Sequence, residues 1–161
     1  MCEKEEAPLY QKTVLHKNFL YLINDEDKTA SVIQYQRPRK YIIDEVIPRS
    51  INFDSTEYIV TSISKYAFKN DSMLSLTFAP DSEVRLIKQK AFKKFSVKKV
   101  SLPSTLEELS DDWCTNNQYI TNVEINNSNY MSHEGKFIFG KLSKDQENFN
   151  VFIFCAKDVE E

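Results

Sequence analysis

A pattern of apolar residues that recurs three times is the feature that most constrains how this 161-residue chain folds. Each copy has two aliphatic residues three positions apart, followed four positions later by a pair of core-forming residues. The copies are Val60, Ile63, Ala67 and Phe68, then Val84, Ile87, Ala91 and Phe92, and then Leu106, Leu109, Trp113 and Cys114. From Phe68 to Phe92 and from Phe92 to Cys114 the spacings are 24 and 22 residues, which predicts a protein built from stacked repeats.

A second apolar triplet follows each copy, and the spacing of its three members is the same in every copy. Its members are Met73, Leu76 and Phe78, then Val97, Val100 and Leu102, and then Ile120, Val123 and Ile125. The last two residues of each triplet alternate with a polar one, as in a short strand that buries one face. Because one unit cannot bury its apolar face alone, neighbouring units must stack. We therefore expect Leu76, Val100 and Val123 on successive strands of one parallel sheet.

The segment around each Ala-Phe pair is expected to form a helical turn. In the first copy this segment is 64–69, and Ser64 can cap its beginning. The small Ala67 lets the turn lie close to the strands, while Phe68 fills the space between the layers. One strand and one helical turn per unit predict a fold of the α/β repeat class.

Both ends of the chain differ from the repeats and predict β-hairpins. Near the N-terminus, the apolar runs 19–23 and 30–35 flank a polar turn at 24–28, which predicts a hairpin that covers the open end of the stack. Near the C-terminus, runs 136–140 and 150–155 flank a second polar loop, which predicts a hairpin that is a cap or a protruding insert. The expected division is an N-terminal hairpin segment over 1–42, about three repeats over 43–130, and the C-terminal hairpin over 131–161.

At these residues the chain resembles the BspA-like leucine-rich-repeat family, including the surface-antigen repeats of protists. Leu102, Pro103 and Leu106 match the opening of the family unit, and the Ala-Phe pairs match its centre. The chain departs from the family where Trp113 and Cys114 replace Ala-Phe, and it lacks the Gly common before Ala-Phe. The resemblance implies a short right-handed leucine-rich-repeat solenoid with a parallel sheet flanked by β-hairpins. It also implies adhesion and the binding of host proteins, a function that fold alone does not fix.

Composition and charge exclude several classes of function. The net charge is −3, which favours neither nucleic acid nor an anionic membrane surface. No run approaches the roughly 20 apolar residues of a membrane span. Gly135 and Gly140 are the only glycines, so the clustered glycines of phosphate-binding loops and nucleophile elbows are missing. We expect no nucleic-acid partner, no membrane insertion and no cofactor.

Two features of the sequence bear on the compartment in which the protein works. Residues 1–6 are acidic and contain no apolar run, unlike a secretory signal. The three cysteines, Cys2, Cys114 and Cys155, include no closely spaced pair, which favours a reducing compartment. These features predict a cytoplasmic protein, whereas the family resemblance implies the cell surface.

The outward positions of the expected strands are the candidate binding surface. Stacked units bring such positions into columns along the sheet. The residues are Ser75, Thr77, Lys99, Ser101, Asn122 and Glu124. We expect them to form a small polar plate that binds a protein or glycan partner. The alternative is that they are only solvated strand positions.

A second candidate is the densest cluster of positive charge in the chain. It contains Arg85, Lys88, Lys90, Lys93, Lys94, Lys98 and Lys99. Such a cluster suits an acidic partner or a polyanion. The simpler interpretation is the solvated convex side of one repeat, paired in part with Glu107, Glu108, Asp111 and Asp112 of the next. Exposed pairs of this kind contribute only about 0–1 kcal/mol each.

The residue types that carry chemistry give no catalytic or metal site. Cys114 takes the position of Phe68 and Phe92, which indicates a core residue. Cys155 ends an apolar run, and His133 lacks any signature of nucleophilic catalysis. The favoured function is a non-enzymatic binding module that acts by protein–protein interaction or adhesion through the solenoid surface. The alternative is an intracellular scaffold with no surface role.

Overall fold

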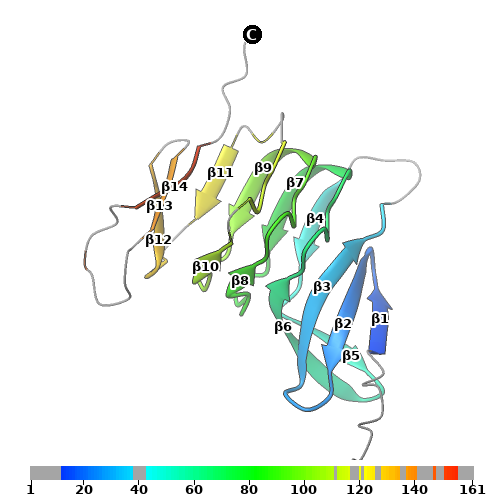
Figure 1. Ribbon diagram of the computed structural model, residues 1–161. Helices are drawn as coiled ribbons and strands as arrows, with labels where there is room; N and C mark the ends of the chain where they lie inside the picture. The colour runs from blue at the N-terminus through cyan, green and yellow to red at the C-terminus, as the bar shows by residue number, and fades with distance from the viewer. Residues whose placement is uncertain are drawn as a thin grey trace, which may run out of the picture.

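The computed structural model gives a fold made of strands and turns. It describes residues 12–37, 43–110, 112–116, 120, 122–125, 128–134, 137–140, 147 and 151–155. Over these ranges the strands form three sheets, and no residue is helical (Figure 1). The sheets have seven, four and three strands.

The four-stranded sheet is the one that the repeated triplets predict. Its strands are β4 (Asp44–Ile47), β7 (Ser72–Phe78), β9 (Ser96–Leu102) and β11 (Asn122–Ile125), which lie side by side in chain order (Figure 1). All three pairings are parallel. Leu76 is in register with Val100, which is in register with Val123. The expectation that these residues occupy successive strands of one parallel sheet is confirmed.

A second sheet, which the sequence did not predict, runs along the repeats. It contains β6 (Thr56–Ile63), β8 (Leu86–Ile87) and β10 (Glu108–Leu109), which pair in parallel. The second aliphatic residue of each copy, Ile63, Ile87 or Leu109, therefore belongs to a strand as well. Each repeat contributes one strand to each sheet, and the apolar interior lies between them. One further strand, β5 (Ser50–Phe53), pairs antiparallel with β6.

The N-terminal hairpin is confirmed and is joined directly to the second sheet. It consists of β2 (Phe19–Asn24) and β3 (Thr29–Tyr35), with an additional strand, β1 (Lys12–His16), at its edge. β3 pairs in parallel with β6, so the hairpin continues the sheet past the first repeat. Phe19 and Tyr21 have no exposed surface, because they cover the end of the apolar interior.

The C-terminal hairpin is also confirmed. β13 (Phe137–Gly140) pairs antiparallel with β14 (Val151–Cys155), and β12 (Met131–Glu134) is a third strand that the sequence did not predict. Met131 and Ile138 are buried in the same hydrophobic cluster as the repeats. The domain boundaries after residues 42 and 130 stay a prediction.

The segments around Ala-Phe are turns and not helices, which corrects the expected α/β class. Their amide groups donate three residues back: Ala67 to Ser64 at 3.2 Å, Ala91 to Lys88 at 3.2 Å, and Trp113 to Ser110 at 3.1 Å. The residue before each pair has a left-handed backbone, with φ of 66° at Tyr66, 58° at Lys90 and 56° at Asp112. Because an α-helix needs φ near about −60°, it is interrupted there in every copy. The solenoid winding and its right hand stay predictions.

The turns of successive repeats are bonded to one another by their backbones. Phe68 donates its amide to the Ala91 carbonyl at 2.9 Å, and Phe92 donates to the Trp113 carbonyl at 2.8 Å. Tyr35, at the end of β3, extends this ladder by donating to the Ala67 carbonyl at 2.8 Å. Backbone groups that a helix would have satisfied internally are thus paired between repeats, as burial requires.

A continuous row of aromatic rings fills the interior beside these turns. The Phe68 ring stacks on Phe92 at 4.9 Å between centroids, and Phe92 meets Trp113 edge-on at 5.5 Å. Towards the N-terminus, Phe68 stacks on Tyr35 at 5.9 Å. Trp113 fills the place next to Phe92, so Cys114 is only partly buried against the core. By backbone register Cys114 does take the Phe position, because Trp113 matches Ala67 and Ala91 in its hydrogen bonds, but the aromatic ring is supplied by Trp113 and Cys114 is not fully buried.

Candidate functional site

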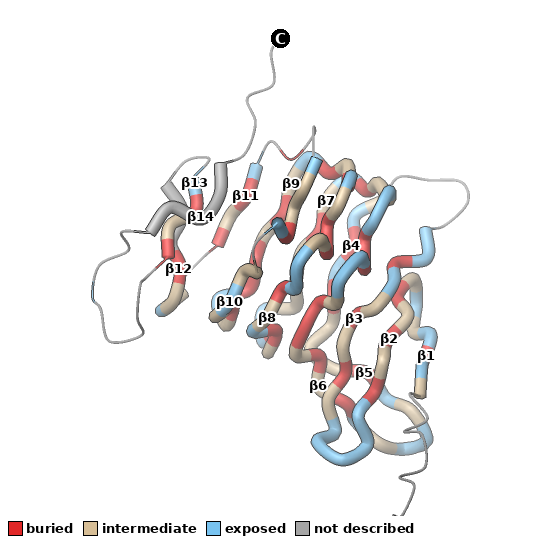
Figure 2. Tube along the Cα trace, viewed as in Figure 1, coloured by how far each residue is buried: buried red, intermediate tan, exposed pale blue. Residues whose placement is uncertain are grey.

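The predicted polar plate lies on the outer face of β7, β9 and β11. Ser75 is in register with Lys99 and Lys99 with Asn122, while Ser101 is in register with Glu124. All six predicted residues are exposed or half-buried, and they alternate with buried aliphatic residues along the strands (Figure 2). The structure therefore brings the predicted residues together on one face.

Glu124 is the centre of the polar contacts within the plate. The Lys99 ammonium lies 2.9 Å from its carboxylate, and the Ser101 hydroxyl donates to the same carboxylate at 3.4 Å. The Asn122 amide donates to its other oxygen at 3.5 Å. Bonding to Lys99 is the main cause that lowers the pKa of Glu124. Both charges of the pair are partly exposed, so the contact contributes about 0–1 kcal/mol to stability.

The outer face extends further than the sequence predicted, onto β4. Ser75 donates to the carboxylate of Asp44 at 2.5 Å, and Asp44 is in register with it on the neighbouring strand. Val46 on β4 and Leu74 on β7 are 51% and 43% exposed. The apolar triplets did not predict this strand, because Glu45 stands in register with Leu76, where the pattern expects an aliphatic residue.

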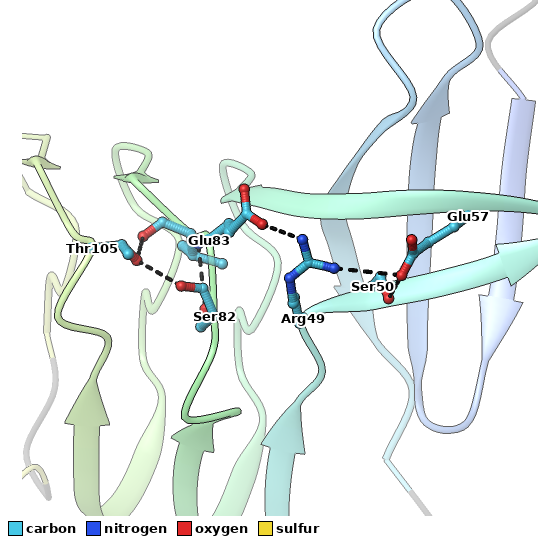
Figure 3. Close-up of polar contacts among 7 residues, drawn as sticks. Arg49, Ser50, Glu57, Ser82, Glu83 and Thr105 are labelled. Carbon is cyan, nitrogen blue, oxygen red and sulfur yellow. Dashed lines mark hydrogen bonds and ion pairs between the residues drawn. The ribbon is translucent and has the colours of Figure 1, made fainter.

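A polar network joins the loops at the ends of the strands (Figure 3). Arg49, just after β4, contacts Glu83 at 2.5 Å and Glu57 of β6 at 3.5 Å, and Ser50 donates to Glu57 at 2.6 Å. The Thr105 hydroxyl lies 2.8 Å from the Val84 carbonyl of the preceding repeat. These contacts fix one loop to the next and hold the strands of the plate in register.

A buried carboxylate lies where the N-terminal hairpin meets the first repeat. Glu45 is 7% exposed and accepts hydrogen bonds from the Asn18 amide at 2.7 Å and the Tyr35 hydroxyl at 3.0 Å. The Tyr21 hydroxyl is buried and has no hydrogen-bond partner among the described residues. Burial, together with the charge of Glu45, raises the pKa of both tyrosines above the usual range. The two donors to Glu45 that the described residues supply are neutral, so among them the hairpin is joined to the repeats without an ion pair.

The described residues include no group of three or more His, Cys, Asp or Glu side chains placed to hold a metal ion. They also include no helix of the length and apolarity that crossing a membrane requires. A shallow depression is lined by Gln89, Glu108, Leu109 and Ser110, and none of these is a strong nucleophile. The side chains of His133 and Cys155, the residues considered above for nucleophilic chemistry, lie outside the described part of the structure.

Comparison with known proteins places the repeats in context. The sequence model of the BspA type leucine rich repeat region matches residues 49–151 in six copies. Among solved structures, a leucine-rich repeat protein from Bacteroides capillosus is 19% identical, with 70% of this chain and 97% of that chain covered and a TM-score of 0.43. A leucine rich cell surface protein from Faecalibacterium prausnitzii is 12% identical, with 84% and 59% covered and a TM-score of 0.39. No curated protein sequence matches the chain.

Proposed function

Because the chain belongs to the BspA-type leucine-rich-repeat family, we propose that it is a non-enzymatic protein-binding module. The family suggests a protein-interaction role, and we assign that role to the outer face of β4, β7, β9 and β11. This face, called the strand face below, consists of Ser75, Thr77, Lys99, Ser101, Asn122 and Glu124 together with Asp44, Val46 and Leu74.

The observation that carries this proposal is the regular display of unlike side chains on four adjacent parallel strands. Neighbouring strands lie about 4.8 Å apart, so Asp44, Ser75, Lys99 and Asn122 form one row across the sheet. Exposed apolar side chains lie among these polar groups, at Val46 and Leu74. Protein-binding surfaces combine apolar contacts with a polar rim in this manner.

The Lys99–Glu124 pair is proposed to contribute specificity. Its two charges are held in one place on the face by the contacts of Ser101 and Asn122. A charge pair at an interface selects partners of complementary charge and rejects those with like charges facing it. Reversing the pair therefore changes which proteins bind without removing the pair itself.

Affinity capture with a swapped pair tests this assignment. The variant Lys99→Glu with Glu124→Lys keeps the ion pair but exchanges its two charges. The proteins that this variant captures from a cell extract are compared with those that the unchanged protein captures. The matched control is Lys12→Glu with Asp54→Lys, which swaps another exposed ion pair, 3.7 Å apart, on the N-terminal hairpin and the β5–β6 turn. We expect the first swap to lose specific partners and the control to retain them. Equal partner sets for all three proteins, each with the same melting temperature, would remove the strand face as the binding surface.

We further propose that this protein binding serves adhesion at the cell surface. This proposal rests on the family, while the alternative of an intracellular scaffold rests on the cysteine pattern of the sequence. Protease treatment of intact cells, followed by immunoblotting, separates the two. Digestion of the protein on intact cells supports adhesion, and complete protection until lysis supports the scaffold.

A further inference from the structure

The turns that follow β6 and β8 carry a cluster of lysines that the strand face does not include. This lysine patch consists of Lys65, Lys69, Lys88, Lys90, Lys93 and Lys94, with Tyr66 among them. All seven residues are exposed or half-buried. Other members of the positive cluster seen in the sequence lie elsewhere: Arg85 contacts Glu107 at 4.0 Å, and Lys99 belongs to the strand face.

Backbone hydrogen bonds hold the two turns of the lysine patch side by side. Tyr66 donates its amide to the Lys90 carbonyl at 3.2 Å, and Asn70 donates to the Lys93 carbonyl at 3.1 Å. Chains paired in this way are separated by about 4.8 Å. Lys69 of one turn therefore lies beside Lys93 of the next, and the positive charges form a double row fixed by the backbone.

The positive charge of the lysine patch is not neutralised by ion pairs within the described structure. None of the six lysines forms an ion pair with a described residue, and the ion pairs found involve Lys12, Arg49, Arg85 and Lys99. Among the described acidic residues of the same and the adjoining turn, Asp112 accepts the backbone amide of Lys90 at 3.0 Å through its carbonyl oxygen. Neither its carboxylate nor that of Asp71 forms an ion pair with a lysine of the patch. Like charges held at this spacing repel one another, so a bound polyanion gains from every lysine that it approaches.

Tyr66 adds an aromatic surface to the lysine patch. Its side chain is 39% exposed, and the ammonium groups of Lys65 and Lys69 each lie 5.1 Å from the centre of its ring. A ring flanked by two cations offers a flat apolar contact next to anion-binding groups. A sugar ring that carries sulfate groups is complementary to this surface, because it has a flat apolar face for the aromatic ring and adjacent negative charges for the ammonium groups.

We propose that the lysine patch binds a sulfated polysaccharide. This site lies on the turns, apart from the strand face, so it goes beyond the proposed protein-binding function. The chemistry favours a sulfated glycan over a nucleic acid. Single strands are bound on series of aromatic rings, and this patch has one.

Calorimetric titration with a size-defined heparin oligosaccharide, at an ionic strength of about 0.15 M, tests the proposal. The variant Lys69→Glu with Lys93→Glu is expected to weaken binding by at least about tenfold, because two aligned attractive charges become repulsive. The matched control is Lys12→Glu with Lys28→Glu, which makes the same change of net charge at the opposite end of the N-terminal strands from Tyr35, the residue that bonds to the patch turn. It is expected to change the affinity less than about twofold, because charges at that distance are screened.

Further arms identify the ligand chemistry and separate the two proposed surfaces. Tyr66→Asn, which tolerates the left-handed backbone, is expected to weaken heparin binding with an unchanged dependence on salt. The swap of Lys99 and Glu124 is expected to leave heparin binding intact, so failure of one surface does not decide the other. The proposal is overturned if the unchanged protein does not bind heparin, if desulfated heparin or a DNA oligonucleotide binds as tightly, or if the control loses as much affinity as the patch variant.

Discussion

The rings of Phe68 and Phe92, from neighbouring repeats, stack with their centroids 4.9 Å apart and their planes inclined by only 16°. Both side chains have no exposed surface. The contact is repeated in altered form on either side, by Tyr35 in the N-terminal hairpin and Trp113 in the last turn. Cohesion between repeats therefore depends on one aromatic row together with the two sheets.

Truncation of the central ring is expected to be the most damaging single change. Phe92→Ala should lower the free energy of unfolding by about 3–5 kcal/mol, because it opens a cavity between Phe68, Phe95 and Trp113. Urea denaturation followed by circular dichroism measures this effect. The control Leu15→Ala, at a side chain that is 55% exposed, should change the value by less than about 0.5 kcal/mol. Equal effects of the two changes would contradict the claim that the row of aromatic rings stabilises the contact between repeats.

The left-handed residues of the turns predict an unusual response to glycine. Lys94 has φ of 54°, where a residue with a Cβ is strained, so Lys94→Gly should be neutral or stabilising by up to about 1 kcal/mol. At Lys93 φ is not positive, so glycine relieves no strain there and only makes the unfolded chain more flexible. Lys93→Gly should therefore destabilise the fold by about 0.5–1 kcal/mol. Both changes remove one lysine charge from the same turn, so their thermal unfolding can be compared directly. A larger loss of stability for Lys94→Gly than for Lys93→Gly would contradict the left-handed backbone assigned to Lys94.

Two buried tyrosines are expected to respond oppositely to loss of their hydroxyl groups. Tyr35→Phe removes a donor to the buried Glu45 and should destabilise by about 1–3 kcal/mol. Tyr21→Phe removes a buried hydroxyl that has no partner among the described residues, so it should be neutral or stabilising by about 1 kcal/mol. Chemical denaturation of both variants at neutral pH checks the pair. Destabilisation by both to the same extent would contradict the assigned contacts of Glu45.

The same tyrosines predict loss of stability in alkali. Burial raises the pKa of Tyr21 and Tyr35 in the folded chain, while unfolded tyrosine titrates near about pH 10. Above that pH the unfolded chain loses protons that the folded chain retains, so the free energy of unfolding falls as pH rises. The stabilisation is complete below this pH and is lost towards the raised folded pKa. Tyr21→Phe should make the decline shallower, and an unchanged decline would contradict the burial of that hydroxyl.

Thr105 is predicted to join neighbouring repeats through its hydroxyl. That group lies 2.8 Å from the Val84 carbonyl and 3.2 Å from the Ser82 carbonyl. Thr105→Val preserves the shape of the side chain, and it should lower the free energy of unfolding by about 1 kcal/mol because these bonds are lost. The adjacent, exposed Ser104→Ala serves as the control, with an expected change below about 0.5 kcal/mol. Equal values from urea denaturation would show that the hydroxyl bonds do not stabilise the fold.

The strands of the plate could be predicted because apolar and polar residues alternate along each of them. Leu76, Val100 and Val123 alternate with polar residues, and alternation fixes which side chains face the core. The hairpins were predictable for the same reason, since a polar turn separates two apolar runs. The plate residues followed from the repeat spacing, which places equivalent positions in columns.

The turns and the second sheet could not be predicted from these patterns. Tyr66 and Lys90 are not residues that favour a positive φ, so the sequence lacks the glycine that would have indicated a turn in place of a helix. β8 and β10 are two residues long, too short to show alternation. Their pairing depends on neighbouring repeats, and a local pattern does not report such a contact. Of the lysine patch, Lys88, Lys90, Lys93 and Lys94 were visible as charge in the sequence. Lys65 and Lys69 joined them only through the pairing of the turns.

The stacking of the repeats is the claim on which the strand face and the lysine patch both depend. Nuclear Overhauser contacts between backbone protons of the isotope-labelled protein measure it directly. Cross-strand contacts are expected from Ser75 to Lys99 and from Lys99 to Asn122, in parallel register. Contacts of helical type throughout 64–69, with no contact between these three residues, would contradict it.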